Sequence, residues 1–156
     1  MDRLAAFFDA NVLYPAPLRN LLMRLALRDL FRAKWSQSVH DEWIEAALRD
    51  RPKLDRKKLE RTRALMDAHV RDCLVEGYEE LIASIVLPDP GDRHVLAAAI
   101  RGGAEVIVTM NLKDFPAKTL APYGIEAQHP DTFIMYLIEH HVPHRAGCRR
   151  GRCGSA

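Results

Sequence analysis

The chain has 156 residues, of which 48% are hydrophobic and 28% are charged, and its formal net charge is +2. This composition is typical of one globular domain and excludes a strongly basic or low-complexity protein. Its apolar runs are much shorter than the roughly 20 residues that cross a bilayer, and Asp2 stands where a secretion signal would be basic. Three cysteines without a pairing pattern fit a reducing compartment. We therefore expect a cytoplasmic protein that does not bind membranes.

Along the chain, short apolar runs of strand character alternate with segments of helical spacing. The boundaries follow from apolar periodicity, from proline at helix starts, and from glycine or proline after helix ends. In chain order, the predicted elements are a strand at 4–8, a helix at 18–32, a strand at 33–36, helices at 39–49, 56–70 and 78–84, a strand at 85–87, a helix at 92–101, a strand at 105–109, a helical turn at 118–120, a strand at 125–127 and a helix at 130–140. This alternation predicts an α/β fold with a short central parallel sheet covered by helices on both faces.

Two helix starts carry a predicted cap. Ser38 precedes the helix at 39–49, and Asp41 follows it by three residues in an arrangement like a capping box. Asp55 is the candidate cap of the charged helix at 56–70.

The end of the chain differs in composition from the rest. Residues 143–156 are rich in Arg, Gly, Cys and Ser and lack apolar periodicity, which predicts a disordered basic tail after one folded domain at 1–142. A second group of basic residues lies at 49–63. It is either the wall of a groove for a polyanion or a solvated helix face.

Four acidic residues stand at predicted element boundaries: Asp9, Glu42, Asp92 and Asp114. The carboxyl ends of parallel strands meet at one edge of a sheet, where ligand sites form. Carboxylates gathered at that edge would repel one another without a cation between them, and Mg²⁺ prefers oxygen ligands of this kind. Each residue taken alone also has a structural explanation, as a turn residue, a helix cap or an exposed acid in a first helical turn.

Asp92 has the strongest local argument. It stands three and four residues before Val95 and Leu96, so it lies on the apolar face of its predicted helix. A carboxylate there is stabilised by the helix N-terminus and is available to a metal ion. The alternative is a simple N-cap, but Asp89 in the preceding Pro-Asp-Pro-Gly turn can take that role.

As a set, these positions resemble the PIN-domain nucleases, a family that contains the VapC-type toxin ribonucleases. The similar segments are Asp9-Ala10-Asn11-Val12-Leu13, Ser38-Val39-His40-Asp41-Glu42, Asp92-Arg93-His94-Val95-Leu96-Ala97-Ala98-Ala99 and Thr109-Met110-Asn111-Leu112-Lys113-Asp114-Phe115. They occur in the family's order and spacing, and the resemblance covers about residues 4–140. One departure is Asn111, where many relatives carry Asp.

The resemblance implies a three-layer α/β/α domain that hydrolyses RNA with Mg²⁺ or Mn²⁺. Asp9, Glu42 and Asp92 would hold the ion, and Asp114 would bind a second ion or orient the attacking water. Further contacts to ligands or substrate are implied for Asn11, Ser38, Thr109 and Asn111. The implied partners are RNA, an antitoxin protein of a type II toxin–antitoxin pair, and a second copy of the chain.

Two other hypotheses compete with this one. A PIN-like module that has lost activity and only binds RNA or protein is supported by Asn111 and opposed by the intact acids. An aspartyl phosphatase or a receiver domain is disfavoured, because Asn11 stands where a phosphatase needs a second Asp and Asp9 lacks the acidic neighbour of a receiver.

Overall fold

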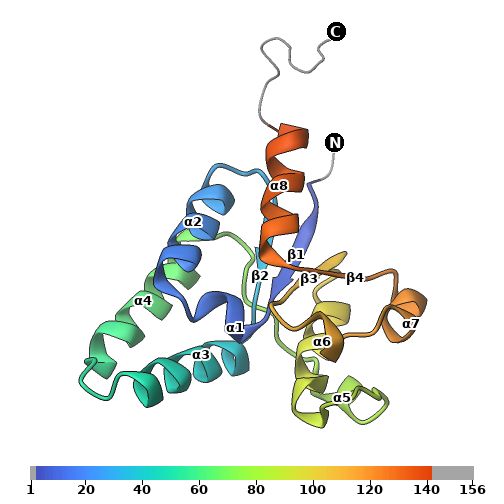
Figure 1. The fold of residues 1–156 in the computed structure, drawn as a ribbon, viewed down its shortest axis with the longest axis horizontal. Helices are drawn as coiled ribbons and strands as arrows, with labels where there is room; N and C mark the ends of the chain where they lie inside the picture. Colours follow the sequence, from blue (N-terminus) through green and yellow to red (C-terminus); the bar gives the residue numbers. More distant parts are fainter. Residues whose placement is uncertain (1–2, 142–156) are drawn as a thin grey trace, which may run out of the picture.

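The protein's structure is a computed structural model, and it describes residues 3–141. A four-stranded sheet lies at its centre, with every strand parallel to its neighbours and the strand order β2-β1-β3-β4. The strands are β1 (Ala5–Phe8), β2 (Arg32–Lys34), β3 (Val106–Val108) and β4 (Glu126–Gln128). Helices flank this sheet, which confirms the predicted α/β fold (Figure 1).

The helices fill the connections between the strands. They are α1 (Ala10–Leu13), α2 (Ala16–Leu27), α3 (Gln37–Asp50), α4 (Arg56–His69), α5 (Glu79–Ile82), α6 (Arg93–Arg101), α7 (Ala117–Leu120) and α8 (Pro130–His141), with 3₁₀ turns η1 (Pro90–Asp92), η2 (Leu112–Asp114) and η3 (Ala121–Tyr123). In Figure 1, α2, α3 and α4 lie toward the β2 edge, and α5, α6 and α7 lie toward the β4 edge.

The core occupies both faces of the sheet. Phe7 and Phe8 point to opposite faces because side chains alternate along a strand, and neither is exposed. The ring of Phe8 packs edge-on against Phe31 and, across 6.1 Å, against Phe133 of α8. Helix α6 packs against β1 and β3 through a run of small buried residues, Ala97 to Ala99. The sheet is therefore the middle layer between helices.

Two predicted helix boundaries are wrong. The helix predicted at 18–32 ends at Leu27, because Asp29 adopts a left-handed backbone (φ 62°) that an α-helix does not continue through. The N-cap of α3 is Ser36 rather than Ser38, and its hydroxyl accepts a 3.2 Å hydrogen bond from the Val39 amide. The cap predicted at Asp55 is confirmed.

The predicted strand at 85–87 is also wrong. Ile85 and Leu87 are buried, but Val86 between them is 82% exposed, and the segment joins no strand of the sheet. Its alternating burial comes from packing of an irregular connection against the core. The preceding helix is shorter than predicted and corresponds to α5.

The predicted tail at 143–156 lies outside the described residues. Within residues 3–141, no helix combines the length and the apolar character that a bilayer crossing requires.

Candidate active site

The site begins with Asp9 at the carboxyl end of β1. The Asp9 amide donates to the Val108 carbonyl at 3.0 Å, so β1 and β3 remain paired up to this point. The Asp9 side chain is 7% exposed, and its Oδ1 accepts a 2.8 Å hydrogen bond from the Ala10 amide. Burial raises the pKa of Asp9, and hydrogen bonds from Thr109 and Ala10 partly offset that rise. Asp9 is therefore a buried carboxyl group held at the edge of the sheet.

A network of polar side chains joins the ends of β1 and β3 around Asp9. The Thr109 hydroxyl donates to Asp9 Oδ2 at 2.9 Å, and Asn11 Nδ2 donates to the same oxygen at 3.3 Å. Asn11 Oδ1 accepts from the Met110 amide at 3.1 Å, and Thr109 Oγ1 accepts from the Asn111 amide at 3.1 Å. These bonds fix the direction of the Asp9 carboxyl group.

Beside Asp9 lies a pocket of about 310 Å³. Its lining residues are Asp9, Ala10, Asn11, Tyr14, Ala46, Asp89, Asp92, Asn111 and Asp114. None of these described lining residues is basic. Three of the four predicted acids, Asp9, Asp92 and Asp114, thus surround one cavity although they come from β1, η1 and η2. We call this cavity the acidic pocket.

The carboxyl group of Asp92 is strongly perturbed in this pocket. It stands at the start of α6, where its side chain makes no helix-cap hydrogen bond. Burial raises its pKa from 3.8 to about 7, and the charges of Asp9, Asp89, Asp114 and Glu42 add to the rise. Near neutral pH this group is close to half-protonated. A positive ion would favour its charged form.

The fourth predicted acid, Glu42, does not line the acidic pocket. Its side chain on α3 is 47% exposed, and Oε2 lies 2.9 Å from Nε2 of His94 on α6. Ala46, one turn further along α3, lines the acidic pocket, so Glu42 stands at its margin. Burial opposes protonation of His94, but its hydrogen bond to Glu42 and the charges of Glu42, Asp9 and Asp92 outweigh burial and raise the His94 pKa.

Asp89 lines the acidic pocket, whereas Ser38 does not. Asp89 Oδ1 accepts a 2.8 Å hydrogen bond from the Gly91 amide, which confirms its predicted turn role, yet Asp89 also lines the acidic pocket. Ser38 lies outside the pocket, and its hydroxyl is 3.0 Å from the Tyr78 hydroxyl. A structural bond between α3 and the loop before α5 therefore accounts for Ser38.

Among residues 3–141, no group of three or more His, Cys, Asp or Glu side chains is already arranged as a metal site. The chemistry of the donors nevertheless fits a hard divalent cation. Asp9, Asp92 and Asp114 offer carboxylate oxygens and Asn111 an amide oxygen, the ligand types that Mg²⁺ and Mn²⁺ take. Burial is the largest cause of the raised pKa of both Asp9 and Asp92, and the charges of neighbouring carboxylates add to it.

Sequence reasoning missed two residues at this site. His94 stands two positions after Asp92. The available sequence signal was a polar side chain directly before the apolar run from Val95 to Ile100. Tyr14 lines the acidic pocket and donates its hydroxyl to Asp50. Only the pairing of α1 with α3 brings Tyr14 and Asp50 together.

The fold and the acidic pocket define a class of proteins, and a comparison with family models identifies it. Residues 5–113 match the model described as "PIN domain", and the chain belongs to this family.

Two relatives refine the comparison. Over 63 residues, which are 40% of this chain, it is 58% identical to "Putative ribonuclease VapC50" of Mycobacterium tuberculosis. The match spans 37% of that protein's length. Among solved structures, VapBC-1 from nontypeable Haemophilus influenzae superposes with a TM-score of 0.55 at 16% identity, covering 82% of this chain and 99% of the other. At that identity, the similarity establishes the fold alone.

Proposed function

We propose that this chain is an endoribonuclease that hydrolyses RNA phosphodiester bonds with Mg²⁺ or Mn²⁺ in the acidic pocket. One observation carries the proposal: Asp9, Asp92 and Asp114 surround one cavity without a basic lining residue, and the pKa of Asp92 is raised to about 7. A carboxyl group whose pKa is strongly raised, in a cavity shared with other acids, indicates a functional site.

Each residue has a role in this proposal. Asp9, Asp92 and Asp114 would hold the ion, and Glu42 would complete the set after leaving His94. The Thr109 hydroxyl and the Asn11 amide hold Asp9 Oδ2 in place. Asn111 lines the pocket beside Asp114 and would contact the substrate or the ion through its amide oxygen. When bound, the ion lowers the pKa of a water molecule and neutralises charge on the phosphate.

The biological setting is part of the same proposal. The Mycobacterium tuberculosis relative is named a putative ribonuclease VapC50, and the Haemophilus influenzae structure is that of VapBC-1. Both support a toxin of a type II toxin–antitoxin pair, with an antitoxin protein and a second copy of the chain as partners. Domain bounds of 1–142 and a cytoplasmic location also belong to this proposal.

The second candidate is a PIN-like module that binds RNA or protein without cutting. The observation in its favour is that Glu42 is bonded to His94 outside the acidic pocket. Asn111 in place of an acid adds to it. A module of this kind would bind its ligand without needing a divalent ion.

Cleavage of a fluorescent single-stranded RNA separates the two candidates. Wild type, Asp92→Asn and the control Asp29→Asn are compared in Mg²⁺, in Mn²⁺ and in EDTA. Asp29 is exposed, and Asn adopts its left-handed backbone readily. We expect metal-dependent cutting by wild type and control, and a loss of about a hundredfold or more in Asp92→Asn. Folded wild type that binds RNA but never cuts it would favour the binding module.

A further inference from the structure

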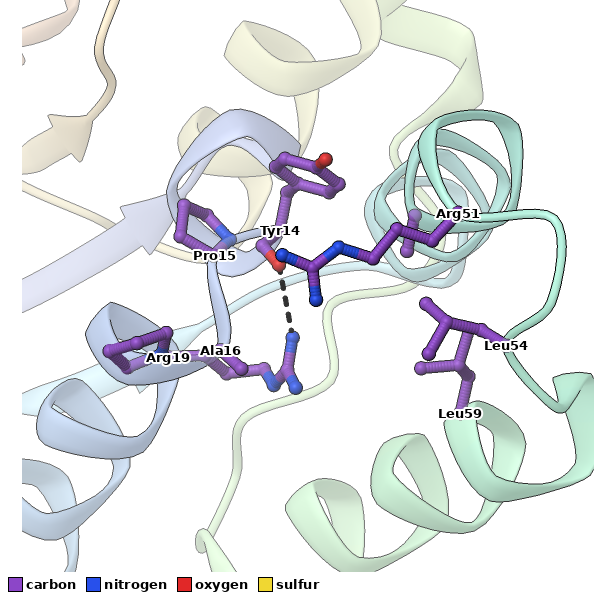
Figure 2. Close-up of a pocket in the computed structure, with 9 residues that line it drawn as sticks. Tyr14, Pro15, Ala16, Arg19, Arg51, Leu54 and Leu59 are labelled. Atoms are coloured by element: carbon purple, nitrogen blue, oxygen red, sulfur yellow. Dashed lines mark hydrogen bonds between the residues drawn. The ribbon is translucent and has the colours of Figure 1, made fainter.

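A second pocket, of about 350 Å³, adjoins the acidic one (Figure 2). It lies between the start of α2 and the junction of α3 with α4, and we call it the α2 pocket. The residues that matter for its chemistry are Tyr14, Pro15, Arg19, Arg51, Leu54 and Leu59. Tyr14 lines both pockets, and Ala46 of the acidic pocket is followed in α3 by Ala47 of the α2 pocket. The two pockets are therefore neighbours.

Arg19 is a buried cation at the base of the α2 pocket. Its side chain is 7% exposed, its Nη1 donates to the Leu13 carbonyl at 2.8 Å and to the Tyr14 carbonyl at 3.3 Å, and its guanidinium lies 4.5 Å from the centre of the Trp43 ring. Arg19 Nε is buried without a hydrogen-bond partner. Within residues 3–141, no carboxylate forms an ion pair with Arg19.

Arg51 adds a second cation on the opposite wall. In Figure 2, its side chain extends from the end of α3 toward the turn at Tyr14 and Pro15. Leu54 and Leu59 lie below it in this view. Arg51 is exposed and has no ion-pair partner in the described part of the chain. Its neighbour Asp50 is engaged by the Tyr14 hydroxyl.

The start of α2 makes the same cavity more positive. Pro15 occupies the N-cap position of this 12-residue helix and offers no side-chain cap. No N-cap side chain therefore accepts from the first amides of the helix, those of Ala16 and Leu18, since Pro17 has no N–H. The positive end of the helix dipole at such a terminus attracts anions. A buried unpaired guanidinium, an exposed arginine and an uncapped helix thus surround one cavity.

We propose that the α2 pocket binds the phosphodiester group next to the scissile one in a single RNA strand. This inference rests on the proposed function, and it names the part of the protein that holds the substrate. The acidic pocket repels a polyanion, so a strand must be held by positive groups beside it. The α2 pocket provides these groups, while Pro15, Leu54 and Leu59 offer an apolar surface to the attached nucleoside.

RNA is favoured over an acidic protein segment because the α2 pocket and the acidic pocket share Tyr14 in their linings. A nucleic-acid strand carries an anion on every nucleotide, so a strand with one phosphate at the acidic pocket brings further phosphates to its surroundings. Binding of an acidic peptide would not require the α2 pocket to neighbour the acidic pocket.

The test measures binding of a fluorescent single-stranded RNA to the full chain by anisotropy, in EDTA and at several salt concentrations. Arg51→Gln and Leu54→Glu alter the α2 pocket at exposed positions, so both variants should fold. Arg28→Gln is the matched control, since Arg28 is exposed at the other end of α2. We expect Kd to rise about tenfold in Arg51→Gln and in Leu54→Glu, and to stay unchanged in the control.

The salt dependence gives a second readout. Loss of one phosphate contact should lower the slope of log Kd against log salt by about 0.7 in Arg51→Gln. Equal Kd and slope in Arg51→Gln and Arg28→Gln would overturn the inference. So would Arg51-dependent binding of a labelled oligoglutamate peptide with RNA binding unchanged, because the pocket would then serve a protein partner. No step requires cleavage, so an inactive wild type would refute the proposed function without affecting this test.

Discussion

The imidazole of His94 lies 2.9 Å from the carboxylate of Glu42, although 52 positions separate them in the chain. This pair joins α6 to α3 at the margin of the acidic pocket. It holds one of the four predicted acids away from the other three. A cation that recruited Oε2 of Glu42 would have to displace the imidazole, so the pair would set part of the free energy of ion binding.

The first prediction concerns this pair. His94→Ala releases Glu42 and removes a positive group beside Asp9 and Asp92, so Mn²⁺ should bind several-fold more tightly. The change corresponds to about 1 kcal/mol for a partly exposed pair. Calorimetric titration of Mn²⁺ without RNA measures it. His129→Ala, on a partly exposed histidine that is no part of the acidic pocket, is the control. Weaker or unchanged Mn²⁺ binding in His94→Ala would contradict the role given to the pair.

The second prediction concerns stability and pH in the metal-free protein. The folded-state pKa of Asp92 lies above its ordinary value, so the folded state keeps this proton after the unfolded state has released it. The stabilising contribution of Asp92 to the free energy of unfolding is therefore fully present below pH 3.8, and it is lost as the pH rises to about 7.

Urea unfolding of wild type and Asp92→Asn across this pH range isolates that contribution. Asp92 is half-buried, so solvent screening reduces the expected difference between the two curves to about 1–2 kcal/mol. Wild type should lose stability relative to Asp92→Asn between pH 4 and pH 7, and millimolar Mg²⁺ should restore it above pH 7. Parallel curves in EDTA would show that Asp92 titrates normally.

The third prediction concerns the hydroxyl of Thr109. Thr109→Val keeps the shape of the side chain but removes the donor to Asp9 Oδ2 and the acceptor for the Asn111 amide. We expect a loss of about 1–3 kcal/mol in the free energy of unfolding, because Asp9 Oδ2, the Asn111 amide and Asn11 Nδ2 each lose a partner. RNA cleavage should fall as well. Thr132→Val on the exposed face of α8 should change neither stability nor cleavage. Equal effects of Thr109→Val and Thr132→Val would contradict the role given to the Thr109 hydroxyl.

The fourth prediction concerns α8. Phe133 is fully buried and packs edge-on against Phe31 and Phe8, with ring centres 5.0 Å and 6.1 Å away. Phe133→Ala should lower the free energy of unfolding by about 3–5 kcal/mol, whereas Met135→Ala, at a position that is 54% exposed, should change it little. Thermal unfolding of the two variants provides the comparison. Similar midpoints would mean that α8 contributes little to the core.

The sequence predicts the centre of the site well because local rules decide it. An apolar run places Asp9 at the end of a strand, and parallel pairing brings Thr109 beside it. The apolar stripe of α6 likewise predicts that Asp92 faces inward.

Contacts between distant helices are not predicted from the sequence. Periodicity assigns Glu42 to a face of α3, but it cannot show that His94 of α6 meets that face. Similarly, Ser36 and Ser38 are equal candidates for a helix cap by residue type. Ser36 is the cap because the helix begins directly after it, just past the end of β2, and because the Ser38 hydroxyl is hydrogen-bonded to Tyr78 instead. The sequence places Arg19 in an amphipathic helix, and only its packing against Trp43 shows that its guanidinium is buried.

The central claim is that a divalent ion binds among Asp9, Asp92 and Asp114. Crystals of the full chain soaked in MnCl₂ test it through anomalous scattering of manganese. We expect an anomalous peak in the acidic pocket, with carboxylate oxygens of these residues within about 2.3 Å. The peak should be absent from Asp92→Asn crystals soaked in the same way. Full manganese occupancy elsewhere, with the acidic pocket empty in wild type, would contradict the account.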